Sequence, residues 1–320
     1  MLDLNKVYNM DCLKGLKQLP DNSINCCVTS PPYWGLRDYG VEGQLGLEST
    51  PEEYVSKMVE VFREVKRVLR KDGTLWLNLG DSYYNYRPGK GQVLVKQTVS
   101  KTKQDLPDTC PRRGNKLAGL KEKDLVGIPW MVAFALRADG WYLRQDIIWH
   151  KPNPMPESVK DRCTKAHEYI FLLTKSAQYY YDNEAIKEKA VSGTDVGILR
   201  SKKQATCNHP SILKRQKENI DSRTAGDGNR NKRSVWTITT KPFKEAHFAV
   251  FPPELPEICI KAGCPEGGTV LDPFAGAGTT LYVAEQLGRN SIGIELNPDY
   301  CDIIRRRMAG IEPNLFEGVK

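Results

Sequence analysis

An apolar run that ends in two consecutive prolines constrains this chain more than any other stretch. Residues 24–28 form the run, and Thr-Ser-Pro-Pro-Tyr-Trp-Gly follows at 29–35. This pattern predicts a buried strand that ends in a stiff loop, because each proline fixes its own φ. With the Ser30 hydroxyl and the flat faces of Tyr33 and Trp34, such a loop can hold a planar ring that bears an amino group. Taken alone, the pattern also fits a Pro-Pro turn after an edge strand, with its aromatic residues in the core.

A second strand with a specialised loop lies near the other end of the chain. Residues 269–280 read Thr-Val-Leu-Asp-Pro-Phe-Ala-Gly-Ala-Gly-Thr-Thr, and a helical stretch continues to Gly288. A strand, an acidic residue, a Gly-x-Gly turn and a helix start are typical of a nucleotide-type cofactor loop. The third small residue of a dinucleotide fingerprint is missing, and no lysine follows the glycines as in a P-loop. The pattern therefore argues against an NAD enzyme and against an ATPase.

Together the two motifs resemble those of the S-adenosylmethionine-dependent DNA amino-methyltransferases, which methylate the exocyclic amino group of cytosine or adenine. In that family Ser/Asp/Asn-Pro-Pro-Tyr is the catalytic loop and Asp-x-Phe-x-Gly-x-Gly is the cofactor loop. The catalytic loop comes first here, as in the permuted β group, and serine at position 30 occurs mostly in cytosine-N4 enzymes.

The resemblance implies what the protein binds and makes. S-adenosylmethionine would be the cofactor, S-adenosylhomocysteine its product, and double-stranded DNA the partner. The target would be the N4 amino group of cytosine, reached by base flipping and direct transfer, with adenine N6 as the alternative. A cognate restriction endonuclease would be a functional, not a physical, partner. Cytosine-C5 chemistry is excluded because its Pro-Cys pair is lacking: Cys110-Pro111 and Cys264-Pro265 run the other way.

Alternating strand and helix patterns, together with the resemblance, predict a Rossmann-like methyltransferase fold, an α/β doubly wound and mainly parallel sheet with permuted motif order. We expect residues 1–181 to form the catalytic half, with a basic insertion at 83–125. Residues 182–235 would be the target-recognition region, and residues 236–320 the cofactor-binding half.

Local patterns place several elements. Residues 50–70 predict a helix, because Thr50 and Glu53 form a capping box and the apolar residues recur at helical spacing. Lys71-Asp72-Gly73 predicts the end of that helix, and residues 74–79 predict a strand. Residues 141–149 and 167–173 predict two further strands, and residues 179–181 a third.

Positive charge is concentrated in two segments. The chain carries a formal charge of +8, and residues 186–235 alone hold 12 Lys/Arg against 5 Asp/Glu. Residues 83–125 hold 10 against 4. This distribution favours a surface that follows DNA phosphates, whereas two solvated loops that only aid solubility are the alternative.

The resemblance also assigns candidate site residues. The catalytic set is Ser30, Pro31, Pro32 and Tyr33. Glu295 lies at the end of the second strand of a βαβ unit, the place at which an acidic residue binds ribose hydroxyls. The full cofactor set is Asp11, Phe248, Asp272, Phe274, Gly276, Gly278, Thr279 and Glu295. Asp11 can instead cap the helix that follows it. The DNA-binding set is Trp34, Arg37, Trp149, Lys151, Arg162, Lys202, Lys203, Lys214, Arg215, Lys232 and Arg233.

Some functions are disfavoured by what the sequence lacks. The 9 cysteines form no Cys-x-x-Cys pair, so we expect reduced thiols and no metal site. No apolar stretch approaches the roughly 18 residues of a membrane span, and the N-terminus lacks a signal-peptide pattern. We therefore expect a cytoplasmic protein that is associated with the nucleoid through DNA.

Overall fold

The computed structural model describes residues 2–36, 38–84, 117, 119–190, 229–241 and 250–310. The chain divides into two compact units, Met1–Tyr181 with Ser234–Lys320, and Asp182–Arg233. In the second unit, β6 (Glu188–Lys189) pairs antiparallel with β7 (Asn229–Arg230).

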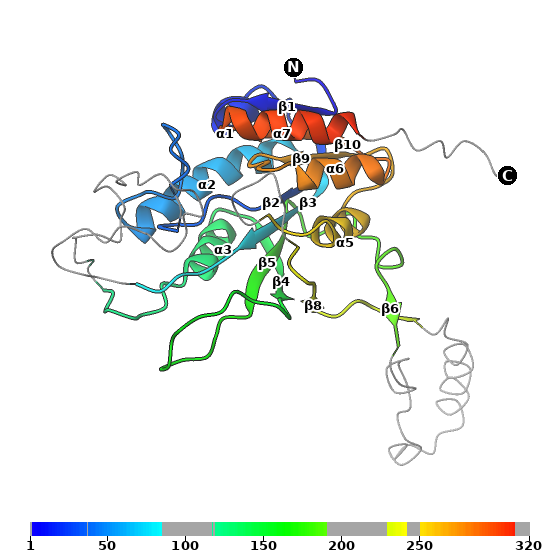
Figure 1. Cartoon of the computed structure of the whole chain (residues 1–320). Helices are drawn as coiled ribbons and strands as arrows, with labels where there is room; N and C mark the ends of the chain where they lie inside the picture. Colours follow the sequence, from blue (N-terminus) through cyan, green and yellow to red (C-terminus); the bar gives the residue numbers. More distant parts are fainter. Residues whose placement is uncertain are drawn as a thin grey trace, which may run out of the picture. The chain divides into compact units, whose positions relative to one another are not determined.

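The first unit is built on an eight-stranded sheet with the order β1-β10-β9-β2-β3-β5-β4-β8 (Figure 1). Every strand of this sheet runs parallel to its neighbours except β5, which is antiparallel to both β3 and β4. The strands are β1 (Lys6–Asn9), β2 (Ile24–Thr29), β3 (Leu69–Leu79), β4 (Tyr142–His150), β5 (His167–Thr174), β8 (Val235–Thr237), β9 (Thr269–Asp272) and β10 (Asn290–Glu295).

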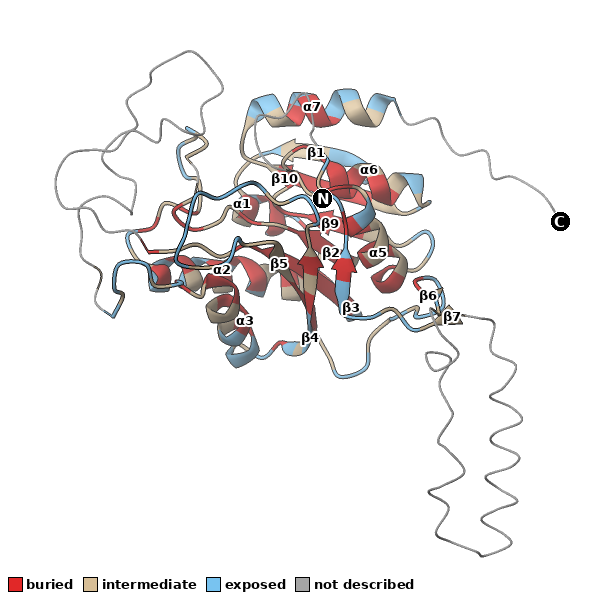
Figure 2. Ribbon diagram, turned by 60° about the horizontal axis from the view of Figure 1, so that its bottom comes forward, coloured by how far each residue is buried: buried red, intermediate tan, exposed pale blue. Residues whose placement is uncertain are grey.

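Helices cover both faces of this sheet, because its central strands are apolar on both sides. Leu75, Leu77 and Leu79 of β3 join the core beneath α1, α2 and α3, while Trp76 lies on the face of α5. Figure 2 shows helices that are buried toward the sheet and exposed on the outside. The helices are α1 (Cys12–Leu16), α2 (Pro51–Val68), α3 (Ile128–Ala138), α5 (Glu254–Gly263), α6 (Thr279–Gln286) and α7 (Pro298–Ala309).

The pairing of β2 with β9 is what positions the site. Cys26 lies opposite Val270, and Cys27 opposite Leu271, in a parallel register. Parallel strands end at the same edge of a sheet, so the loop after β2 and the loop after β9 begin side by side. Residues from opposite ends of the chain therefore meet, as the permuted order predicts.

Two expected elements differ from the structure. The helix predicted for residues 50–70 ends at Val68, and Leu69 is already extended, with φ −63° and ψ 140°. Leu69 pairs with Ile24, so β3 includes Lys71-Asp72-Gly73 in place of a helix cap. The strand predicted at 179–181 is absent from the described sheet, and Tyr181 instead stacks against Trp76 with ring centroids 6.4 Å apart.

The sequence analysis did not predict α5. Two prolines precede this helix and Pro256 lies in its first turn, where a missing N–H leaves no intrahelical hydrogen bond unmade. Within the described residues, no helix has the length and apolar character needed to cross a membrane. The same residues contain no cluster of three His, Cys, Asp or Glu side chains that could hold a metal ion.

Candidate active site

A cavity of about 630 Å³ lies at the ends of β2, β9 and β10. This is the edge at which open α/β sheets bind ligands, and the volume falls within the roughly 300–1,000 Å³ of small-molecule sites. Both predicted loops line the cavity, the first through Ser30, Pro31, Pro32 and Tyr33 and the second through Phe274, Gly276 and Thr279. With Asp11 and Glu295, which also line the cavity, the structure brings the four predicted catalytic residues together with five of the predicted cofactor residues.

The two proline carbonyls of the first loop differ in their surroundings. The hydroxyl of Tyr54, on α2, donates a hydrogen bond of 2.8 Å to the Pro32 carbonyl. No described residue donates a hydrogen bond to the Pro31 carbonyl. Pro31 is therefore the better candidate to accept a hydrogen bond from a ligand.

Tyr33 is fixed at its ring and at its hydroxyl. An added Cβ at Gly80 would come within 2.4 Å of Tyr33 Cε2, so the ring occupies the space that this glycine leaves open. The hydroxyl lies 2.8 Å from Glu168 Oε2, 3.1 Å from Asn78 Oδ1 and 3.3 Å from Ser30 Oγ. Burial, and then the charge of Glu168, raise the pKa of Tyr33 well above its ordinary value of 10, which keeps the phenol neutral.

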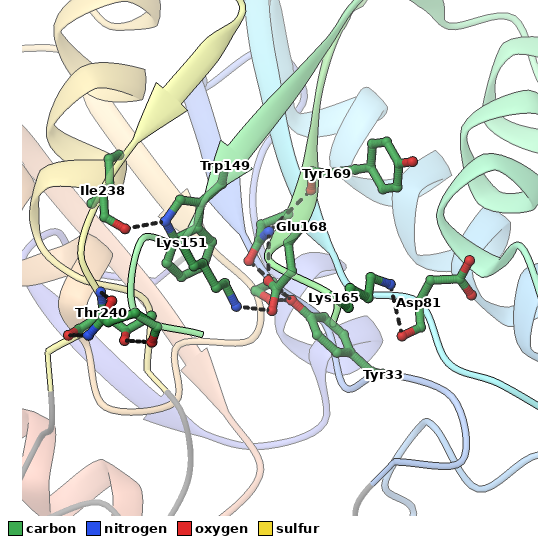
Figure 3. Close-up of polar contacts among 12 residues, drawn as sticks. Tyr33, Asp81, Trp149, Lys151, Lys165, Glu168, Tyr169, Ile238 and Thr240 are labelled. Atoms are coloured by element: carbon green, nitrogen blue, oxygen red, sulfur yellow. Dashed lines mark hydrogen bonds and ion pairs between the residues drawn. The ribbon is translucent and has the colours of Figure 1, made fainter. Parts of the chain in front are cut away.

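Glu168 is a cavity residue that the sequence analysis missed. Its carboxylate accepts hydrogen bonds from Tyr33 and from Asn78 Nδ2, the latter at 3.2 Å, and forms an ion pair with Lys151 (Figure 3). Lys151 Nζ also lies 4.2 Å from the centroid of the Trp149 ring. The sequence signal that could have identified Glu168 is a charged residue at the start of β5, a strand that is otherwise mainly apolar. The sequence analysis assigned this residue no role.

Glu295 closes the cofactor side of the cavity. Its carboxylate accepts backbone hydrogen bonds of 2.8 Å from Gly276 and from Asn297. Burial raises the pKa of Glu295 to about 7, against an ordinary value of 4.5. Asp11 also lines the cavity, and it accepts a 3.0 Å hydrogen bond from Lys14 N, so the expected helix cap is present.

Asp272 and Gly278 were predicted to bind the cofactor, but neither of them lines the cavity. The Asp272 side chain is buried, and it accepts hydrogen bonds from Thr29 Oγ1 at 2.6 Å and from Phe274 N at 3.1 Å. A Cβ at Gly278, where φ is +73°, would come within 2.8 Å of Ile304 on α7. Both residues shape the second loop, and neither is among the cavity-lining residues.

One predicted DNA contact is corrected by burial, and a second lies inside the cavity. Trp34 is only 2% exposed and donates a 2.9 Å hydrogen bond to the Glu48 carbonyl, so its ring has no surface to offer DNA. Lys151 lines the cavity and pairs there with Glu168, and its contact with a phosphate stays a prediction. Trp149 lines the cavity, as expected for a wall of a base pocket.

Three other predicted contacts lie beside carboxylates, and two of them share Glu188 with Arg230. Arg162 pairs with Glu157 at 2.6 Å and stacks on the ring of Tyr83. In the second unit, Arg233 lies 3.1 Å and Lys232 3.8 Å from carboxylate oxygens of Glu188. The remaining predicted site residues lie outside the described residues: Arg37, Lys202, Lys203, Lys214, Arg215 and Phe248.

The model of the N6/N4 DNA methylase family matches residues 24–306. The chain belongs to this family. The type II methyltransferase M.Cfr9I of Citrobacter freundii is 46% identical over 98% of this chain and 92% of its own length. The type II methyltransferase M.SmaI of Serratia marcescens is 44% identical over 95% of this chain and 90% of its own length.

Solved structures share the fold. The cytosine-N4-specific PvuII DNA methyltransferase superposes with a TM-score of 0.61 at 19% identity, covering 97% of this chain and 87% of that one. A DNA modification methylase of Thermus thermophilus, described as putative and complexed with S-adenosyl-L-methionine, gives a TM-score of 0.57 at 23% identity. That match covers 95% of this chain and 93% of the other. The doubly wound sheet described above is thus a Rossmann-like methyltransferase fold.

Proposed function

We propose that this DNA methylase transfers the methyl group of S-adenosylmethionine to the N4 amino group of a cytosine in duplex DNA. We further propose that it is the modification enzyme of a restriction–modification system. The observation that carries the proposal is one cavity lined by both the Ser30-Pro31-Pro32-Tyr33 loop and the glycine loop after β9. A methyl donor and an acceptor base need such a shared space, because direct transfer requires their reacting atoms to meet.

The residues of the second loop fit the proposed cofactor. Gly276 lines the cavity, and the nearest atom to an added Cβ there is 3.9 Å away, so its backbone is open to close approach by a ligand. Glu295 ends β10 and presents two carboxylate oxygens, the usual acceptors for ribose hydroxyls in this fold. Phe274 adds an apolar surface. When bound, S-adenosylmethionine supplies an electrophilic methyl group on a sulfonium.

The first loop provides for the amino group of the target base. The lone pair of that nitrogen is delocalised into the ring, so the nitrogen is a weak nucleophile. Hydrogen bonds from the amino group to the Pro31 carbonyl and to the Ser30 hydroxyl would favour a pyramidal nitrogen, with its lone pair free to attack. Tyr33 and Trp149 would hold the flipped base as walls of the cavity. Transfer is direct and needs no covalent intermediate.

Cytosine is favoured over adenine by Ser30. Serine at this position is the form that the family shows mostly in cytosine-N4 enzymes, and the name of the PvuII methyltransferase specifies cytosine N4. The N6/N4 family includes enzymes for both bases, so the product has to be identified chemically.

Recognition of DNA is assigned to the basic segment around the second unit. We propose that residues 182–235 choose the target sequence, because residues 186–235 carry a net charge of +7. Binding should then weaken steeply with salt, with log affinity falling by about 0.9 per phosphate contact. DNA binding that is insensitive to salt would contradict this assignment.

The decisive experiment is methyl transfer followed by nucleoside analysis. Duplex DNA is incubated with the protein and tritiated S-adenosylmethionine, digested, and its nucleosides separated and identified by mass spectrometry. We expect N4-methylcytosine. N6-methyladenine as the sole product would replace the proposed base with adenine, and 5-methylcytosine would overturn the mechanism.

A further inference from the structure

The ion pair between Glu168 and Lys151 lies inside the cavity, beside the loop that would hold the target base. Their side chains are 17% and 19% exposed. The attraction within a buried ion pair seldom exceeds the free energy that its desolvation costs, so stability alone seldom explains such a pair. The β4–β5 pairing does not depend on it alone either, because it extends over eight residue pairs from Tyr142 to His150, with one register shift between Leu143 and Gln145. A role in the cavity is the better explanation.

A chain of hydrogen bonds connects Glu168 with the serine of the first loop. Ser30 Oγ lies 3.3 Å from the Tyr33 hydroxyl, which lies 2.8 Å from Glu168 Oε2. Tyr33 has a single hydroxyl hydrogen, and the shorter contact with a carboxylate favours donation to Glu168 over donation to Asn78 Oδ1, at 3.1 Å, or to Ser30. The Tyr33 oxygen then accepts the hydrogen of Ser30.

This direction matters for the target amino group. When the Ser30 hydrogen points to Tyr33, the lone pairs of Ser30 Oγ are left to accept a hydrogen from the amino nitrogen. If Tyr33 instead donated to Ser30, the serine hydrogen would turn elsewhere, including toward the amino group. A carboxylate accepts and never donates when ionised, so it is the group that imposes the useful direction.

Lys151 and Asn78 keep the carboxylate in place for this task. Lys151 Nζ binds Oε1, which leaves Oε2 to Tyr33 and to Asn78 Nδ2. Asn78 is itself fixed, since its Nδ2 also donates to the Tyr169 carbonyl at 3.1 Å. The hydrogen-bond partners that the described residues give the carboxylate thus come from β3, from the residue that follows β4 and from the first loop (Figure 3).

We infer that Glu168 is a positioning residue for methyl transfer, which holds Tyr33 and, through the Tyr33 hydroxyl, sets Ser30 as an acceptor for the target amino group. This inference rests on the proposed function. Its effect belongs to the transfer step, because the cofactor side of the cavity does not involve Glu168.

Single-turnover kinetics of Glu168→Gln test the inference. We expect the transfer rate to fall about tenfold or more, while the Kd for S-adenosylmethionine and the KM for DNA change less than about twofold. Glu168→Asp, which keeps the charge, should recover part of the rate. The matched control is Glu257→Gln on α5, whose carboxylate pairs with Lys261 at 2.6 Å outside the cavity, and it should behave as wild type.

A double-mutant cycle with Tyr33→Phe shows whether Glu168 acts through Tyr33. We expect Glu168→Gln to cost less than about twofold in the Tyr33→Phe background, because the hydroxyl that it orients is gone. Additive effects, or a parallel loss of cofactor binding and thermal stability, would overturn the inference in favour of a purely structural ion pair.

A crystal structure of Glu168→Gln provides a readout that does not depend on activity. A Tyr33 ring and a Ser30 rotamer that stay in their wild-type places, with an unchanged transfer rate, would refute the inference and leave the proposed function intact. A wild-type protein that transfers no methyl group to DNA would instead refute the proposed function, while the structural comparison would still decide whether Glu168 orients Tyr33.

In Lys151→Met, a rise in the KM for DNA without a slower transfer step would assign Lys151 to phosphate binding and separate it from Glu168.

Discussion

The Thr29 hydroxyl donates a 2.6 Å hydrogen bond to the Asp272 carboxylate, and this contact joins the two loops of the cavity. Thr29 is the last residue of β2 and Asp272 the last residue of β9, and each is 1% exposed. Asp272 also accepts from the backbone N–H of Phe274, so it holds the start of the second loop. The acidic residue of the glycine motif therefore serves to tie the loops together.

Replacing Thr29 should loosen this connection. In Thr29→Val a buried carboxyl group loses the hydrogen bond from the Thr29 hydroxyl, and we expect the free energy of unfolding to fall by about 1–3 kcal/mol. Denaturant titration measures it. Thr269→Val, at the other end of β9, is the control, because no described residue pairs with its hydroxyl. Equal stability of Thr29→Val and wild type would show that the contact contributes nothing.

Local sequence was enough to predict β2 and β9, the two strands that lead into the loops of the cavity. Apolar runs bounded by prolines and glycines occur at β2 and β9, and their parallel pairing followed from the permuted order of the motifs. The partners of side chains were harder to foresee, since they depend on contacts across the fold. Pro32 receives its hydrogen bond from Tyr54, 22 residues away, and nothing local distinguishes its carbonyl from that of Pro31.

Two residues that were predicted to contact DNA have partners that the sequence does not reveal, for the same physical reason. An aromatic residue beside a catalytic loop can stack on a base or fill the core, and Trp34 fills the core because the Glu48 carbonyl meets its indole N–H. A lysine after a strand can face solvent or a buried carboxylate, and the β4–β5 register places Lys151 against Glu168. Neither the contact of Trp34 with Glu48 nor that of Lys151 with Glu168 can be predicted from sequence spacing alone.

Gly80 should be essential for the position of Tyr33. Its added Cβ would lie 2.4 Å from Tyr33 Cε2, so in Gly80→Ala the ring has to move. Misplacement of a reacting group by about 1 Å can cost about 100-fold in rate, and we expect slower transfer with unchanged cofactor affinity. Gly310→Ala, where the nearest atom is 3.6 Å away, is the control in the same assays. Wild-type transfer rates in Gly80→Ala would contradict a fixed Tyr33 ring.

Gly276 should control access of the cofactor. Its φ is +53° and the space beside it is open, so an aspartate there would place a second carboxylate near Glu295. We expect Gly276→Asp to raise the Kd for S-adenosylmethionine about tenfold or more, which corresponds to about 1.4 kcal/mol. Gly288→Asp has the same left-handed backbone, with φ +70°, outside the cavity lining, and calorimetry should find its affinity unchanged. Similar affinities in the two variants would remove the glycine loop from the cofactor site.

The pKa of Glu295 predicts opposite effects of pH on stability and on cofactor binding. Burial raises this pKa from 4.5 to about 7, so the folded chain holds a proton that the unfolded chain has already lost between these values. The contribution of Glu295 to the free energy of unfolding is therefore full below about pH 4.5 and is lost as the pH rises to about 7. Asp272, whose pKa burial raises to about 6, acts in the same direction, and its charge adds to the shift of Glu295.

Cofactor binding should instead improve as the pH rises through about 7. Only the ionised carboxylate offers both oxygens as acceptors to two ribose hydroxyls, and binding should in turn lower the pKa of Glu295. Calorimetry from about pH 5.5 to 8.5 should find tighter binding at high pH in wild type and a flatter profile in Glu295→Gln, which cannot titrate. The amino group of the cofactor titrates with either protein, so the difference between the two profiles isolates Glu295. Parallel profiles would exclude Glu295 as the acceptor of the ribose.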